Sequence, residues 1–248
     1  FAVAGVHAFM LLRHKENEFH RGAIHIALLF GAVAAILQPL SGDISAKNVA
    51  KLQPAKLAAM ESLFKTSEPA ALVIGGIPDE EKEEVKYGIH IPHLLSFLAH
   101  GDPNAEVEGL DKTSKEDWPP VAIVHFAFQI MVFMGMLMMG AGILFLIFKF
   151  KWKENLDKIW WLKLLVWLTP VGFIAVEAGW IVTEVGRQPW IIYGIMKTKD
   201  AVTPMPGVQY PFYLITLVYL LLTFLVVWLM RRQILAVHSN TQNLITHD

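Results

Sequence analysis

The sequence predicts an all-α, polytopic membrane helix bundle with one long polar loop. Three observations carry this prediction. Of the 248 residues, 54% are apolar and only 17% are charged, whereas soluble domains carry about 25% charged residues. The mean hydropathy is positive, at +0.45. Several apolar runs also approach the roughly 20 residues that a helix needs to cross a bilayer.

The composition also excludes several kinds of chemistry. The chain has no cysteine, which excludes disulfides, thiolate catalysis, iron–sulfur clusters and covalently attached c-type heme. The side chains left for holding a metal are His, Met, Asp and Glu. The formal net charge of −1 and the lack of a basic tail give no indication of nucleic acid binding.

Five apolar stretches are interpreted as membrane helices. Residues 1–12 are expected to end a truncated helix, because the chain opens inside an apolar run without the basic start of a signal peptide. The ranges 22–41, 121–148, 159–187 and 211–230 are predicted as further spans. Trp and Tyr near several of their ends are typical of the membrane interface.

The charges of the connecting segments predict the orientation in the membrane. Residues 13–21, 149–158 and the tail 231–248 follow the basic pattern of cytoplasmic segments. The long loop 42–120 holds 14 Asp and Glu against 8 Lys, so it is predicted to be extracytoplasmic.

This loop contains one local helix signal, QPAKLAAMESLFK. Pro54 suits a first helical turn, and Leu57, Met60 and Phe64 recur at helical spacing. The pattern predicts a short amphipathic helix, which we expect to rest on the membrane surface.

The segment GWIVTEVGRQPW, residues 179–190, places charges in an otherwise apolar span. Glu177, Trp180, Glu184 and Arg187 fall on one helical stripe. A carboxylate inside a membrane is costly unless it is paired, protonated or bound to a metal. One interpretation is an ion pair that only holds the helix end. The other is a heme, whose iron suits the carboxylate and whose propionates suit the arginine.

These residues resemble subunit I of the cytochrome bd quinol oxidases, in which GWIVTEVGRQPW looks like a signature. Four further motifs are similar to the family in the same order along the chain: KLAAME, GGIPDEEK, IHIPHLL and HFAFQIMVFMG. The resemblance implies the C-terminal part of a subunit I of the short quinol-loop type, with its N-terminal helices missing. It also implies a terminal respiratory oxidase of the prokaryotic inner membrane, which oxidises quinol, reduces O2 to water and separates charge. We expect this chain alone to be inactive.

The resemblance also implies roles for individual residues. Glu184 matches the glutamate at the iron of a high-spin heme, and Arg187 matches an arginine near heme propionates. Met131 matches an axial ligand of the low-spin heme b. The implied set is completed by Trp180 and Gln129 for cofactor binding and by Lys56 and Glu61 for quinol oxidation.

Several of these residues also have a purely structural interpretation. Met131 lies in a methionine-rich helix, where most methionines only pack. Glu61 could pair with Lys65 instead of meeting a quinol. The family usually has a basic residue at the place of Gln129, and an amide there would interact less with heme propionates. The histidines 90, 93 and 100 match no standard zinc spacing and are expected to be exposed loop residues.

The implied cofactors are a low-spin heme b, a high-spin heme b, and heme d or a further heme b, with ubiquinol or menaquinol as substrate. The implied partners are subunit II, a small third subunit as a further candidate, the missing N-terminal part of subunit I, O2 and membrane lipid, with no nucleic acid. Two rival interpretations are an ion or solute transporter that uses the same intramembrane carboxylates, and an assembly subunit without cofactor.

Overall fold

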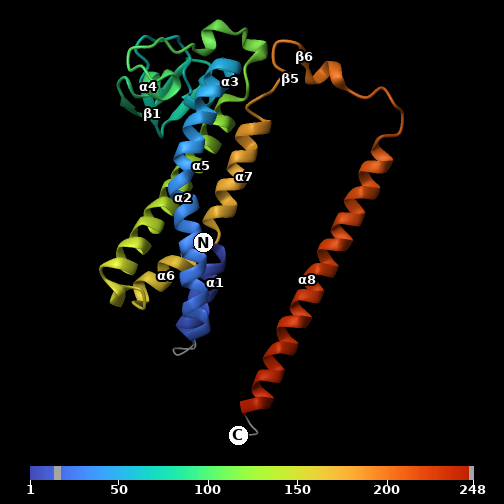
Figure 1. Ribbon diagram of the computed structural model, residues 1–248. Coiled ribbons are helices and arrows are strands. Elements are labelled where there is room, and N and C mark those ends of the chain that lie inside the picture. Colours follow the sequence, from blue (N-terminus) through green and yellow to red (C-terminus); the bar gives the residue numbers. More distant parts are fainter. Residues whose placement is uncertain (14–17, 246–248) are drawn as a thin grey trace. The chain divides into compact units, whose positions relative to one another are not determined.

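The computed structural model describes residues 1–13 and 18–245, and it confirms the predicted fold class (Figure 1). Four helical stretches are long and apolar enough to cross a membrane: Glu18–Leu52, Val121–Phe150, Ile159–Glu184 and Gln209–Arg232. The chain divides into two compact units, Phe1–Ala201 and Val202–Asp248, which are described separately below.

The first unit is a helix bundle with a folded loop at one end. Its helices are α1 (Ala2–Arg13), α2 (Glu18–Leu52), α3 (Pro54–Glu61), α4 (Leu94–His100), α5 (Val121–Phe150), α6 (Ile159–Trp167) and α7 (Val171–Glu184). Its strands are β1 (Leu72–Ile74), β2 (Ile77–Asp79), β3 (Glu84–Lys86), β4 (Ile89–Ile91), β5 (Trp190–Ile192) and β6 (Met196–Lys197). Figure 1 shows α2, α5 and α7 running alongside one another, with the strands of the long loop gathered at one end.

Helix α2 is longer than its apolar part. The predicted span ended at residue 41, whereas the helix continues to Leu52. Residues 42–52 are polar but contain Ala and Lys, which favour helix, and Lys47 Nζ donates to Asp43 Oδ2 at 2.7 Å across one turn. The helix therefore leads straight from the membrane-length segment into the loop.

Helices α5 and α7 pack closely because glycines recur every seven residues on the α7 side. A Cβ atom placed on Gly172 would lie 3.6 Å from Met138 Sδ, and one on Gly179 would lie 3.2 Å from Met131 Sδ. Just after α7, a Cβ on Gly186 would lie 3.3 Å from Val124 Cγ1. Small residues let membrane helices approach closely. A seam of glycines against Met138, Met131 and Val124 thus fixes which residues of the two helices meet.

The predicted span 159–187 consists of two helices rather than one. Helix α6 ends at Trp167 and α7 begins at Val171. Pro170 causes this break, because proline lacks an N–H and its ring clashes with the carbonyl four residues earlier. The first turn of α7 closes with the N–H of Ile174 bonding to the carbonyl oxygen of Pro170 at 3.0 Å.

The long loop is folded rather than structureless. Strands β1 and β4 form one antiparallel pair, and β2 and β3 form another. Helix α3 is buried along almost its whole length, at Ala55, Leu57, Ala58, Ala59, Met60 and Glu61. It packs against α5 and α2. The expectation that this helix rests on the membrane surface is therefore wrong, because protein already covers its faces.

The second unit contains α8 (Gln209–Ile245). Its membrane-length segment is Gln209–Arg232, close to the predicted span 211–230. The helix continues into the predicted tail 231–248, and the side chains beyond 232 lie outside the described residues, as does the backbone of 246–248.

Candidate functional site

The charged stripe predicted from the sequence lies at the end of α7. Arg187 Nη2 forms an ion pair with Glu184 Oε2, and both side chains are 43% exposed. Trp180, one turn before Glu184, is 64% exposed, and Glu177 is exposed as well. An acid, a base and a large aromatic ring thus share one uncovered face of a membrane-length helix. Lipid alone is a poor neighbour for such a face, since charges in hydrocarbon are costly.

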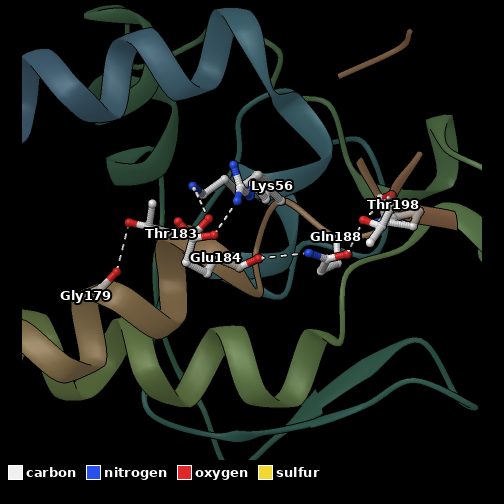
Figure 2. Close-up of polar contacts among 8 residues, drawn as sticks. Lys56, Gly179, Thr183, Glu184, Gln188 and Thr198 are labelled. Carbon is white, nitrogen blue, oxygen red and sulfur yellow. Dashed lines mark hydrogen bonds and ion pairs between the residues drawn. The ribbon is translucent and has the colours of Figure 1, made fainter. Parts of the chain in front are cut away.

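Lys56 of α3 reaches this same end of α7 (Figure 2). Its Nζ donates to the carbonyl oxygen of Thr183 at 3.4 Å, directly beside Glu184. Burial lowers the pKa of Lys56, the positive charge of Arg187 lowers it further, and the negative charge of Glu184 opposes both effects. The loop candidate and the membrane candidates therefore form one electrostatic group, although 127 residues separate Lys56 from Thr183.

The turn after α7 is held firmly against the loop. A Cβ on Gly186 would lie 3.3 Å from Lys56 Cε, so glycine allows the lysine stem to pass. Gln188 Nε2 donates to the Glu184 carbonyl at 3.4 Å, and Thr198 Oγ1 donates to Gln188 Oε1 at 2.7 Å (Figure 2). The cavity left between these elements has a volume of about 10 Å³, which is room for about one water molecule.

Glu61 lies at the other end of α3 and is nearly inaccessible, at 4% exposed. Burial raises its pKa from 4.5 to about 8, so the carboxyl is mainly protonated at neutral pH. Its Oε2 has no hydrogen-bond partner among the described residues, and Lys65 is exposed. The alternative of a Glu61–Lys65 pair is therefore not what the structure contains. Lys56 and Glu61 face different surroundings, as their spacing on the helix predicts.

Met131 faces α7 from the middle of the methionine-rich segment of α5. Its Sδ lies against Gly179, where the missing side chain leaves the space for it. Met138 takes the equivalent place at Gly172, one heptad away, so packing alone does not distinguish the two. Methionine sulfur is an axial ligand of heme iron in proteins, and a carboxylate oxygen is a metal ligand as well. The α5 side of the seam therefore carries a sulfur donor at Met131, and the exposed face at the end of α7 carries the Glu184 carboxylate.

Gln129 and His125 point toward the loop rather than along the seam. Gln129 Nε2 donates to the Val73 carbonyl at 2.9 Å, and His125 is fully buried with a ring nitrogen 2.9 Å from the Met60 carbonyl. No role for His125 was predicted, because a lone histidine in an apolar helix belongs to no recognisable motif. Its position four residues before Gln129 was the one signal that the two share a helix face.

The fold defines a multi-pass membrane protein in which a folded polar loop contacts an acid–base pair at the end of α7. The chain belongs to the cytochrome bd terminal oxidase subunit I family, whose sequence profile matches residues 1–237. The family assignment leaves the transporter interpretation without support.

Individual relatives agree with this assignment. The chain is 37% identical over 234 residues to a Bacillus subtilis protein named "putative cytochrome bd menaquinol oxidase subunit I", covering 93% of this chain and 53% of that protein. It is 35% identical to the cytochrome bd ubiquinol oxidase subunit 1 of the same organism, covering 82% and 46%. The solved bd oxidase of Geobacillus thermodenitrificans matches with a TM-score of 0.77 and 38% identity, covering 90% of this chain and 51% of that one. The chain thus spans about half the length of the relatives that it matches.

Proposed function

We propose that this chain works as part of subunit I of a quinol:oxygen oxidoreductase, a terminal respiratory oxidase of a prokaryotic cell membrane. The observation that carries the proposal is the contact of Lys56 with the end of α7 beside Glu184 and Arg187. This contact joins the loop residue matched to quinol oxidation with the helix residues matched to a heme. An assembly subunit without cofactor has no need for such a junction.

The loop residues are suited to handle a quinol. Oxidation of one quinol releases two protons and two electrons, and two quinols supply the four electrons that convert O2 to two waters. Lys56 carries N–H donors to a quinol oxygen. Glu61, mainly protonated at neutral pH, ionises close to physiological pH and can take up a proton when ionised, as a general base requires. Protons released here leave on the extracytoplasmic side, and those for water come from the cytoplasm, so charge is separated.

The membrane residues are suited to hold heme. Met131 would ligate a low-spin heme b, Glu184 would face the iron of a high-spin heme, and Arg187 would pair with propionates while Trp180 packs beside the ring. When bound, the hemes supply the one-electron carriers between quinol and O2. The full set includes a third heme, of type d or b, with subunit II and a small third subunit as partners. The relatives' names include both menaquinol and ubiquinol, and either quinol suits these side chains.

The test is the low-spin heme signal of the intact oxidase containing this chain. Met131→Leu should abolish the low-spin band in the reduced-minus-oxidised absorption spectrum, because Leu has no donor atom. Met138→Leu is the matched control, since it occupies the equivalent place at Gly172, and it should leave that band in place. An unchanged spectrum in Met131→Leu would contradict the assignment of the ligand, and a wild-type membrane without heme bands would overturn the proposed function.

A further inference from the structure

In the part of the chain that the structure describes, the side-chain hydrogen bonds between α5 and the folded loop come from one stripe at the start of this helix. Ala122, His125 and Gln129 are three and four residues apart and so share a helix face. The N–H of Ala122 donates to Glu80 Oε1 at 3.3 Å, which satisfies one of the free N–H groups of the first helical turn. The next two residues along the stripe contact the loop through their side chains.

Gln129 uses both ends of its amide on the loop backbone. Its Nε2 donates to the Val73 carbonyl at 2.9 Å, and its Oε1 accepts the N–H of Gly75 at 3.3 Å. A lysine or arginine at this position has donors only and could not accept that N–H. The amide therefore fits the loop better than the basic residue that the family usually has here.

His125 holds two separate parts of the loop from a fully buried position. Its Nδ1 lies 2.9 Å from the Met60 carbonyl and its Nε2 lies 3.2 Å from the Gly75 carbonyl. A neutral ring donates one of these hydrogen bonds, and a doubly protonated ring donates both. Gly75 has a φ of +67°, a conformation that glycine adopts readily, and this turn lets its N–H and its carbonyl both meet α5.

We infer that His125 and Gln129 are positioning residues of the quinol site. They fix the Met60 peptide and the Val73–Gly75 segment on α5. Glu61 directly follows Met60, and Met131 lies two residues beyond Gln129 on α5. The two side chains therefore set where the buried carboxyl stands relative to the helix that carries the matched heme ligand. The catalytic consequence of this inference rests on the proposed function. The attachment of the loop to α5 rests only on the hydrogen bonds described above.

The experiment uses the intact oxidase with two substitutions at one position. Gln129→Glu keeps the size and the acceptor for Gly75 but removes the donor to Val73 and places a carboxylate against that carbonyl. Gln129→Leu removes both bonds. His125→Leu removes the ring from the Met60 and Gly75 carbonyls. Because this variant can fail to fold, the Gln129 pair decides the test. His100→Asn, at an exposed histidine that ends α4, is the control.

Three measurements separate the possible outcomes. We expect both Gln129 variants to speed amide exchange over Val73–Gly75 and to raise the quinol KM about tenfold, which is the order of effect of losing one hydrogen bond. The KM should change more than kcat, the low-spin heme band should stay in place, and His100→Asn should match the wild type. Unchanged loop exchange with a shifted heme band would overturn the inference, because Gln129 would then act toward the heme. A wild type without heme would instead overturn the proposed function, while the exchange data would still decide the docking.

Discussion

Glu61 makes the folded protein sensitive to pH in a way that its burial predicts. The carboxyl is 4% exposed and its pKa rises from 4.5 to about 8 in the folded chain. Ionising the carboxyl in the folded chain therefore costs roughly 5 kcal/mol more than ionising it in water, at about 1.4 kcal/mol for each pKa unit. Because the folded state binds this proton more tightly than the unfolded state, stability should fall as pH rises from about 4.5 to about 8, by up to about 1.4 kcal/mol per pH unit.

The substitution Glu61→Gln removes this dependence, since Gln carries no charge at any pH. Any packing penalty of the amide is independent of pH, so the readout is the difference between variant and wild type at several pH values. In the detergent-solubilised oxidase, the melting temperature of the variant relative to wild type should increase by several degrees between pH 5 and pH 8. Glu68→Gln, at an exposed carboxylate of the same loop, should show no such trend. A constant difference for Glu61→Gln across this range would refute the reasoning.

Two further predictions concern the contacts of α7. Lys56→Gln should raise the quinol KM several-fold and leave the heme spectrum unchanged, because the loop loses a cationic donor beside Thr183. Equal KM values for variant and wild type in steady-state oxygen uptake would contradict the role of Lys56. Gly179→Ala should shift the low-spin heme band, since the new Cβ lies 3.2 Å from Met131 Sδ, tighter than ordinary contact, whereas Gly172→Ala, at 3.6 Å from Met138 Sδ, should be tolerated. Identical spectra for the two alanine variants would show that the seam does not position the sulfur.

The membrane-length helices follow from the sequence because hydropathy acts over many residues and needs no partner. Pro170 indicated a break between α6 and α7. The apolar run continues on both sides of it, however, so hydropathy predicted one continuous span. The strands of the long loop have three residues each, too few to show an alternating pattern. Their pairing depends on contacts between distant segments.

The sequence indicated which residues belong to the candidate site, but it did not indicate how they lie relative to one another. The stripe of Glu184 and Arg187 is a local pattern, so helical geometry was enough to find it. The approach of Lys56 to Thr183 joins residues far apart in sequence, and no spacing rule contains it. The burial of Glu61 follows from the packing of α3 against α2 and α5, which brings together segments far apart in the sequence. The hydrogen bonds of Gln129 to Val73 and Gly75 also join distant segments, so they could be found only in the structure.

The seven-residue recurrence of glycine along α7 has a consequence for how this protein can change length. Each glycine meets its counterpart on α5 at the same interval, as in the repeat of a coiled coil. Inserting or deleting one residue between Gly172 and Gly186 would rotate the following side chains by about 100° and carry Glu184 away from Lys56. An insertion of seven residues would keep the phase but lengthen α7 by about 10.5 Å, so it should be viable only where α5 gains seven residues as well. A variant that differs here by any other number would need a bulge to restore the phase.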